Sequence, residues 1–300
     1  MSFSANVKSE LCRAEVEKGC CALAEALGAL LYANTFSAEC IRFVTESRDF
    51  AIRLPRLFRK ALGVRFDVLP EEETSGKQTY ILSDAEKIRR VFELCGFSAD
   101  SSISLHVNFA LLEKECCQRA FLRGAFLAGG TVTDPEKRYH LELSTTHLKV
   151  SRETETLLRE MDLTAKLTER KGNSVLYYKQ SDAIEDFLTS IGAPVSAMAV
   201  MEAKIYKDYR NIANRKANCD SANVDKAVAA AGEQLDAIQK LQDMGKFDTL
   251  PEKLKMTAQL RVDNPDANLA ELTELHEPPL SKSAVNHRLR KLVSLAGEET

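Results

Sequence analysis

The sequence predicts an α+β protein in two parts, a duplicated module with two antiparallel sheets and an all-α domain that follows it. Three observations predict this. Residues 18–37 recur at 114–133, so one structural unit is present twice. In each copy, strand-like runs follow an apolar helix. After residue 195 the apolar residues keep helical spacing to the end of the chain, which indicates a helical domain.

Length, composition and charge limit the class of protein. A chain of 300 residues favours two domains, and 44% hydrophobic residues are enough for real cores. The net charge of −3 excludes a uniformly basic coat for nucleic acid, so any DNA contact must be local. The first residues do not resemble a signal peptide, and no apolar stretch approaches the roughly 18 residues that span a bilayer. We therefore expect a cytoplasmic protein with no membrane partner.

The two copies align without a gap. Eight of twenty aligned positions are identical: Lys18/Lys114, Cys20/Cys116, Cys21/Cys117, Ala24/Ala120, Gly28/Gly124, Ala29/Ala125, Leu31/Leu127 and Thr35/Thr131. A second match follows, because the tripeptide Ser-Asp-Ala begins a helical pattern at both 83–85 and 181–183. Two matches in the same order predict repeats over about 1–100 and 101–195, within a scaffold that covers 1–195.

The expected elements follow the same order in each copy. An apolar helix opens the copy, and a second helix separates two groups of strands. The expected strands are 41–45, 50–54, 64–69 and 79–82 in the first copy, and 140–144, 163–167 and 175–178 in the second. A closing helix covers 85–94 in the first copy and 183–190 in the second.

Gly28 and Gly124 occupy the same place in the two opening helices. A glycine inside a helix costs about 1 kcal/mol relative to alanine, so its presence in both copies suggests a compensating contact. Close packing of the two helices supplies that compensation. We therefore expect the copies to meet along these helices across a pseudo-twofold axis.

A basic helix precedes the last domain. Residues 196–216 have helical apolar spacing and become basic toward residue 216. Asn218, Cys219 and Asp220 are poor helix formers and predict a break, so 196–220 is expected to be a helical basic linker. Candidates for phosphate contacts near the break are Lys207, Arg210, Asn214, Arg215 and Lys216. A polar linker with ordinary capping is the alternative.

Residues 221–300 are expected to form the all-α domain, with helices at 224–244 and 254–262 before its last part. A short helix at 268–276 can begin with a capping box of Asn268 and Glu271, and prolines end it. Ser281 can cap the next helix, whose buried face is predicted to hold Val285, Leu289 and Leu292.

The opposite face of this last helix carries groups that can contact DNA. Two short helices joined by a tight turn form a helix-turn-helix, whose second helix enters the major groove. The residues predicted to face base edges are Ser283, Asn286, His287 and Arg290. The residues predicted to hold phosphates are Ser281, Lys282 and Lys291. A basic surface helix on a helical bundle is the alternative interpretation.

The cysteines do not predict a metal site. The chain has eight: Cys12, Cys20, Cys21, Cys40, Cys95, Cys116, Cys117 and Cys219. None forms a Cys-x-x-Cys pair, and no histidine lies at zinc-finger spacing from them. We expect no metal and no cofactor, with most of these thiols serving as small, reduced core residues.

The duplicated glycine helices and flanking sheets resemble the LAGLIDADG homing-endonuclease fold. In that fold each central helix ends in an aspartate that binds metal, and the two sheets form a saddle over DNA. When the motif is placed on this sequence, Ala33 and Gly129 stand at the two aspartate positions. Metal-dependent phosphodiester cleavage needs carboxylates there. The resemblance therefore implies a scaffold without enzymatic activity, and a metal-dependent endonuclease is the less favoured alternative.

The expected saddle has an uneven charge pattern. The first copy is rich in basic residues: Arg42, Arg48, Arg53, Arg56, Arg59, Lys60 and Arg65. The second copy mixes Lys149 and Arg152 with Glu142, Glu153 and Glu155. DNA binding by the saddle and docking of a protein partner both stay open.

The whole chain resembles the WhiA family. The resemblance rests on the glycine helices without acids, on the segment 211–223 and on the segment 278–292. It implies a transcription regulator of Gram-positive bacteria with roles in sporulation and cell division, and a nucleoid-associated location. It also implies that the C-terminal helix-turn-helix resembles region 4 of sigma factors and binds double-stranded promoter DNA. The alternative is an interaction scaffold that docks RNA polymerase or another regulator, with auxiliary DNA contact.

Overall fold

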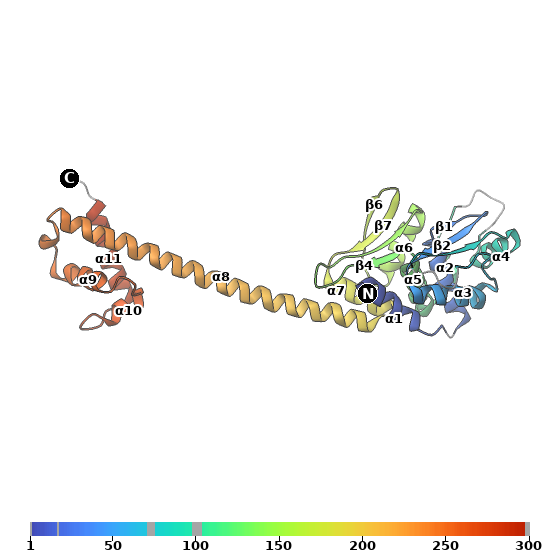
Figure 1. Ribbon diagram of the computed structural model, residues 1–300, viewed down its shortest axis with the longest axis horizontal. Coiled ribbons are helices and arrows are strands. Elements are labelled where there is room, and N and C mark those ends of the chain that lie inside the picture. Colours follow the sequence, from blue (N-terminus) through green and yellow to red (C-terminus); the bar gives the residue numbers. More distant parts are fainter. Residues whose placement is uncertain (1, 17, 71–75, 98–103, 298–300) are drawn as a thin grey trace. The chain divides into compact units, whose positions relative to one another are not determined.

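The computed structural model describes residues 2–16, 18–70, 76–97 and 104–297 (Figure 1). The chain divides into two compact units, Met1–Asp208 and Tyr209–Thr300. This division falls inside the expected linker at 196–220, while the expected boundary between repeats near residue 100 lies outside the described residues. Among the helices described, none is long and apolar enough to cross a membrane.

The first unit contains two copies of one arrangement of helices and strands. The elements of the first copy are α1 (Phe3–Arg13), α2 (Gly19–Leu31), β1 (Thr35–Phe36), β2 (Ile41–Thr45), α3 (Arg48–Leu62), β3 (Gln78–Leu82) and α4 (Ala85–Cys95). Those of the second copy are η1 (Phe109–Leu111), α5 (Glu115–Gly129), β4 (Gly130–Val132), β5 (Leu141–Thr145), α6 (Leu148–Glu160), β6 (Lys166–Arg170), β7 (Asn173–Tyr178) and α7 (Ser181–Ile191). Figure 1 shows the strands of both sheets above α1, α2 and α3.

Both sheets are antiparallel, which confirms the predicted fold class. The described strands pair in the orders β1-β2-β3 and β4-β5-β7-β6. Their first two strands have the same register, because Thr35 lies opposite Arg42 and Thr131 lies opposite Glu142. The strand that follows each central helix therefore pairs with the next strand in the same register in both copies.

Two of the expected strands in the first copy are wrong. Residues 50–54 lie inside α3, because the Ser47 hydroxyl accepts a bond from the Phe50 N–H and starts a helix. The buried residues Phe50, Leu54, Leu57 and Phe58 then follow the helical period. Residues 64–69 form a single bridge from Val68 to Ile81.

The second copy keeps a full hairpin where the first has only that bridge. Lys171 and Gly172 both have positive φ and form a two-residue turn that holds β6 against β7. The strand expected at 163–167 lies a few residues later, at Lys166–Arg170, because this turn fixes the register.

Pro55 lies inside α3 and leaves one helical carbonyl without its usual partner. That carbonyl belongs to Ala51, and the buried hydroxyl of Tyr80 in β3 donates to it at 2.9 Å. The sheet therefore supplies the bond that the proline removes, which holds α3 on the sheet as a continuous helix.

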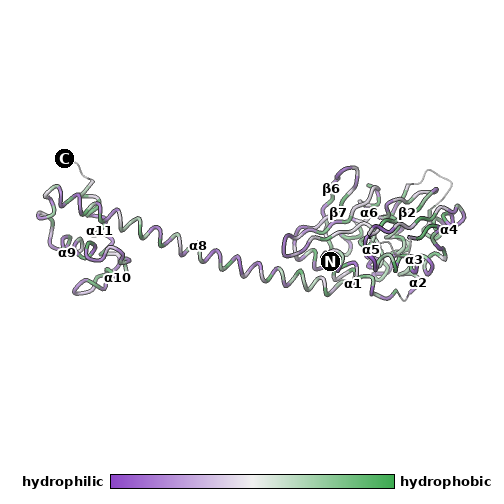
Figure 2. The backbone as a smooth tube through the Cα atoms, viewed as in Figure 1, coloured by the Kyte–Doolittle hydropathy of each residue, from purple (hydrophilic) through white to green (hydrophobic). Residues whose placement is uncertain are grey.

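The break expected at residues 218–220 is wrong, because α8 runs without interruption over Pro194–Asp243. The intrinsic cost of Asn, Cys or Asp in a helix is at most about 0.7 kcal/mol each, which the alanine-rich sequence on either side can offset. Figure 2 shows hydrophilic residues recurring along the middle of α8, and residues 208–230 are exposed on every side.

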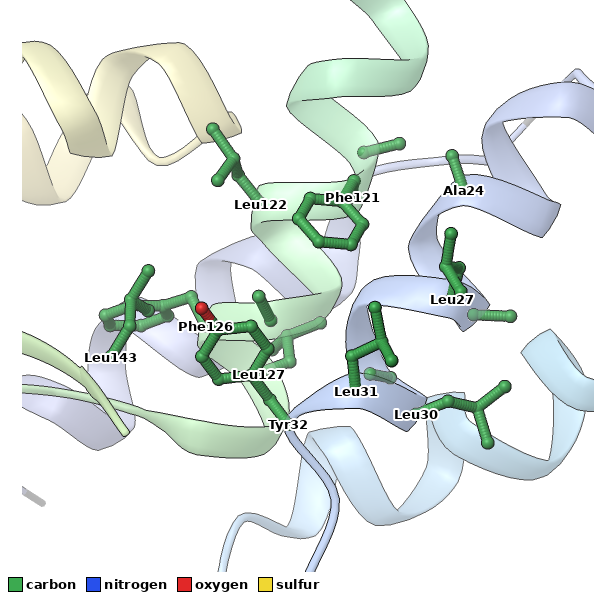
Figure 3. Close-up of a cluster of buried hydrophobic side chains, with 14 of the residues drawn as sticks. Ala24, Leu27, Leu30, Leu31, Tyr32, Phe121, Leu122, Phe126, Leu127 and Leu143 are labelled. Atoms are coloured by element: carbon green, nitrogen blue, oxygen red, sulfur yellow. The ribbon is translucent and has the colours of Figure 1, made fainter. Parts of the chain in front are cut away.

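The core of the first unit centres on the contact between α2 and α5. Figure 3 shows Leu27 and Leu31 of α2, with Tyr32 directly after it, beside Phe121 and Leu127 of α5. All five side chains are buried in one continuous cluster that extends to both sheets. The two copies are therefore joined by a single hydrophobic core, as the paired glycines predict.

The second unit has a separate, all-helical core. After α8 it contains η2 (Phe247–Thr249), α9 (Glu252–Asp263), α10 (Leu269–Glu274) and α11 (Lys282–Gly297). The hydrophobic residues buried in this core, from these helices and the end of α8, are Ala237, Ile238, Leu241, Ala258, Leu272, Val285, Leu289, Leu292 and Ala296. The helix expected at 254–262 is confirmed within α9.

Candidate nucleic-acid interface

The two helices α10 and α11 begin as their sequences predict. Asn268 accepts bonds from the N–H groups of Ala270 and Glu271, and the Glu271 carboxylate accepts from the Asn268 N–H, which completes a capping box. Ser281 accepts from the Ala284 N–H at 3.2 Å and starts α11. Both ends therefore satisfy helical N–H groups with side-chain oxygens.

The helix α11 has one buried face and one exposed polar face. Val285, Leu289 and Leu292 are at most 1% exposed, so the predicted core face is confirmed. Ser283, His287 and Arg290 are exposed on the other side, and Asn286 is half-buried. These four positions share one face, because they are spaced at three, four and seven residues.

The cations at the two ends of this face are also exposed. Lys282, Arg290 and Lys291 are accessible, and no described residue makes a hydrogen bond or ion pair with their side chains. Ser281 is exposed as well, although its hydroxyl serves as the helix cap. The face therefore presents free donors and positive charge, which suits contact with an anionic ligand.

Three polar residues that the sequence analysis did not single out hold α11 in place. His276 is buried, with Nε2 3.0 Å from the Thr257 hydroxyl and Nδ1 2.8 Å from the Leu272 carbonyl. Arg288 of α11 donates to the same hydroxyl at 3.3 Å. The Arg288 guanidinium therefore bonds to α9, whereas that of Arg290 is exposed. The sequence does not distinguish the two arginines, because both belong to the same basic run.

The predicted phosphate-binding residues of α8 fall into two groups. Lys207 donates to the Pro135 carbonyl at 2.6 Å and lies 4.3 Å from the centre of the Tyr139 ring, so its ammonium group is occupied within the first unit. Arg210, Asn214, Arg215 and Lys216 are exposed. The structure therefore sets Lys207 apart from the other four.

The positions of the missing acids lie just beyond or at the end of the two central helices. Ala33 follows the end of α2, and Gly129 is the last residue of α5. A Cβ atom at Gly129 would lie 2.5 Å from the Ser144 carbonyl oxygen and 3.0 Å from a Tyr32 ring carbon. Position 129 thus has no room for a carboxylate unless the neighbouring strand and ring move.

A lysine of the protein lies near this end of the helix pair. The Lys8 ammonium donates to the Leu127 carbonyl, in the last turn of α5, at 3.0 Å. Cations are favourable at helix C-termini because the carbonyl groups there carry partial negative charge. Burial lowers the pKa of Lys8 to about 8.

The open faces of the two sheets carry opposite charges at matching positions. Arg42 lies on the exposed side of β2, whereas Glu142 holds the same place in β5. Glu142 has His140 at 3.1 Å and Arg170 at 3.5 Å as partners. Arg53, one of the expected saddle cations, instead pairs with buried Glu25 at 2.6 Å. The two halves of the saddle are therefore electrostatically unlike.

Comparison with known proteins gives one family for both parts of the chain. The family model described as the WhiA C-terminal HTH domain matches residues 213–296, and the model of the WhiA LAGLIDADG-like domain matches residues 118–210. A protein of Ruminiclostridium cellulolyticum named "Probable cell division protein WhiA" is 40% identical over 304 residues, covering 99% of this chain and 97% of its own. A protein of the same name from Heliobacterium modesticaldum is 39% identical, covering 99% and 96%.

Solved structures show the same fold. The crystal structure of full-length DUF199/WhiA from Thermatoga maritima covers 100% of this chain and 99% of its own, with a TM-score of 0.60 at 22% identity. The structure of the N-terminal LAGLIDADG domain of DUF199/WhiA covers 64% of this chain and 92% of its own, with a TM-score of 0.50 at 23% identity. The likeness to these structures concerns the fold.

Proposed function

This chain belongs to the WhiA family, and from that premise we propose that it is a sequence-specific DNA-binding transcription regulator with a role in cell division and sporulation. The observation that carries the proposal is the exposed polar face of α11, which lies opposite a fully buried face within a helix-turn-helix. The name of the relatives supports the cell-division role. A nucleoid-associated location in the cytoplasm follows from DNA binding.

In this proposal the face of α11 reads base edges in the major groove. Asn286 and Arg290 pair with bases, because the amide suits adenine and the guanidinium suits guanine. Ser283 and His287 make supporting contacts. Ser281, Lys282 and Lys291 hold phosphates on either side of the bases and fix the register of the helix.

The exposed polar residues of α8 supply further phosphate contacts. Arg210, Asn214, Arg215 and Lys216 are accessible and belong to this set. Lys207 is left out, because its ammonium already contacts the Pro135 carbonyl and the Tyr139 ring. These contacts add affinity without adding sequence preference.

The first unit is proposed to bind without cutting. Ala33 and Gly129 offer no carboxylates for divalent ions, and the surroundings of Gly129 leave no space for one. Half-buried Glu142, which takes the place that Arg42 holds on the first sheet, disfavours a phosphate backbone across the whole saddle. This charge pattern supports a second candidate role for the first unit, the docking of a protein partner such as RNA polymerase or another regulator.

Selection of DNA fragments by the full-length protein, followed by titration of single variants, tests the proposal. Arg290→Ala should lose about 1–3 kcal/mol of binding free energy on the selected site and relax the choice of one base. Arg89→Ala, an exposed arginine of α4, is the matched control and should bind normally. Unchanged affinity of Arg290→Ala would show that α11 does not read the bases.

The two alternatives, a metal-dependent endonuclease and an interaction scaffold, predict different results in assays of the same full-length protein. Cleavage of plasmid DNA in the presence of Mg²⁺ would overturn the assignment of a scaffold without enzymatic activity. If the selected fragments share no common sequence, the interaction-scaffold alternative is favoured, with DNA contact that is auxiliary.

A further inference from the structure

Four cysteines meet where the two central helices begin. Cys20 and Cys21 belong to the first turn of α2, and Cys116 and Cys117 to the first turn of α5. Their four Sγ atoms all lie within 4.8 Å of one another. Cys20 is exposed, Cys21 and Cys116 are half-buried and Cys117 is buried, so the cluster reaches from the surface into the protein.

The duplicated helix pair explains why the thiols converge. Each cysteine pair occupies the second and third positions of its helix, and Gly28 and Gly124 allow the two helices to approach closely. Because all four Sγ atoms lie within 4.8 Å of one another, the thiols of one copy are close neighbours of those of the other. The cluster therefore lies across the interface of the repeats.

The spacing of the thiols suits a single tetrahedral ion. Zinc–thiolate bonds of about 2.3 Å place the sulfur atoms of a tetrahedron about 3.8 Å apart. The observed upper limit of 4.8 Å requires the widest pair to approach by about 1 Å, which side-chain rotation can provide. A polynuclear iron–sulfur cluster needs a wider set of thiolates, because bridging sulfides hold its iron ions apart.

Positive charge lies beside the cluster and can offset the negative charge of metal-bound thiolates. The residues preceding both helices, Lys18 and Lys114, make no side-chain hydrogen bond to the helix ends, so neither end has a side-chain cap. Helix N-termini carry partial positive charge and stabilise thiolates. Lys18 and Arg119 also line a depression of about 230 Å³ beside Cys21 and Cys116.

We propose that Cys20, Cys21, Cys116 and Cys117 bind one zinc ion that joins the first turns of α2 and α5. The ion replaces the four thiol protons, and the resulting ZnS₄ group carries two negative charges, which the two helix ends and nearby cations offset. Four protein ligands leave no open position, so the site is structural rather than catalytic. It lies at the opposite end of the helix pair from Ala33 and Gly129.

This site revises the expectation of no metal, and it is independent of DNA binding. Zinc motifs are ordinarily found by two cysteines spaced within one segment, such as Cys-x-x-Cys. Here each segment supplies two adjacent cysteines, and the fold joins them over about a hundred residues of chain. The one signal in the sequence is that both pairs recur at equivalent places in the repeat.

The metal content of the full-length protein tests the proposal directly. The chain is purified with a thiol reductant and without a metal-chelating resin, supplied with equimolar Zn²⁺ and desalted. Elemental mass spectrometry should find about one zinc per chain. A protein that retains no zinc would overturn the proposal, and tightly held iron in place of zinc would overturn the choice of ion.

A second measurement on the unaltered chain identifies the ligands. Alkylation of thiols, read by peptide mass spectrometry, should slow at all four cluster cysteines when Zn²⁺ is present and stay unchanged at Cys40 and Cys219. Substitution with Co²⁺ should give the visible bands of tetrahedral cobalt and thiolate charge-transfer absorption. Equal alkylation with and without Zn²⁺, or disulfides linking these cysteines in the reduced preparation, would contradict the proposal.

Serine variants supply the matched comparison. The double variant Cys20→Ser/Cys117→Ser should hold almost no zinc, whereas Cys40→Ser and Cys219→Ser should hold as much as the unaltered chain. Added Zn²⁺ should raise the Tm of the unaltered protein and leave that of the double variant unchanged, since binding to the folded state alone stabilises it. Full zinc content in the double variant would assign the ion to other residues.

Discussion

Gly28 and Gly124 make reciprocal contacts across the two central helices. A Cβ atom on Gly28 would lie 2.0 Å from the Phe121 carbonyl oxygen, and one on Gly124 would lie 2.0 Å from the Glu25 carbonyl oxygen. Each oxygen belongs to the residue three positions before the other glycine, so the contact obeys the pseudo-twofold symmetry of the repeat. The obstacle in each case is backbone, which cannot rotate aside as a side chain can.

Alanine at either glycine should destabilise the first unit. The added methyl group must push α2 and α5 apart, and overpacking of this kind costs about 1–3 kcal/mol. The free energy of unfolding in urea measures the loss. Gly232→Ala is the matched control, because Gly232 lies in α8 with nothing within 4 Å of its Cβ position, and alanine there should be neutral or stabilising by up to about 1 kcal/mol.

Glu25→Gln should also destabilise the first unit strongly. Glu25 is fully buried and pairs with Arg53 at 2.6 Å and with Arg123 at 3.5 Å, which links α2 to both α3 and α5. Removal of its charge leaves two nearly buried arginines without a counter-ion, at a cost of about 3 kcal/mol or more. Glu115→Gln, which removes an exposed pair with Arg119, should change the unfolding free energy by less than about 1 kcal/mol.

Restoring acids at the degenerate metal positions should not restore a nuclease. Aspartate at Gly129 collides with the Ser144 carbonyl and the Tyr32 ring, so Gly129→Asp should lower the Tm by several degrees. The double variant Ala33→Asp/Gly129→Asp should leave supercoiled plasmid intact with Mg²⁺ or Mn²⁺. Cleavage by the double variant would show that only the two carboxylates are missing from the site.

Lys8 should make stability rise with pH above neutrality. Burial lowers its pKa from 10.5 to about 8, so between these values the unfolded chain binds more protons than the folded one, and the free energy of unfolding increases with pH. Lys8→Met lacks this contribution. The difference in unfolding free energy, unaltered protein minus variant, should therefore grow from pH 8 to pH 10.5, and a flat difference would contradict the shifted pKa.

Lys291→Ala should weaken DNA binding equally on all sequences. The exposed ammonium has no partner among the described residues, so it is free to release counter-ions from one phosphate. Titrations at several salt concentrations should show a slope of log affinity against log salt that is smaller by about 0.9. Arg288→Ala is the contrast, because loss of its bond to Thr257 should lower the stability of the second unit.

The sequence by itself determined the features that depend on neighbours along the chain. The capping box of Asn268 and Glu271 and the buried face of α11 are local patterns, and the structure has both as predicted. The repeat predicted the close packing of α2 against α5, because a glycine conserved between the copies has few other physical explanations. The remaining assignments on α11 stay predictions about a ligand.

Local signals were insufficient where a nearby cap or turn decided the outcome. The apolar run at 50–54 has strand-like composition, but the Ser47 cap and the spacing to Leu57 and Phe58 make it a helix. Residues 218–220 have low helix propensity but did not break α8, because their small intrinsic cost is offset by the helix-forming residues on either side. The thiols were expected mostly in cores, yet of the eight cysteines, all of them described, Cys95 and Cys117 are the buried ones.

Only the tertiary structure decided which distant groups meet. Glu25 pairs with Arg53 and Arg123, and Arg288 bonds to Thr257 of α9. Lys8 bonds to the last turn of α5, and four cysteines from the two repeats lie together. Each of these contacts depends on how helices cross, and the crossing is set by packed side chains and backbone contact at the glycines. Spacing within a single segment carries no information about such crossings.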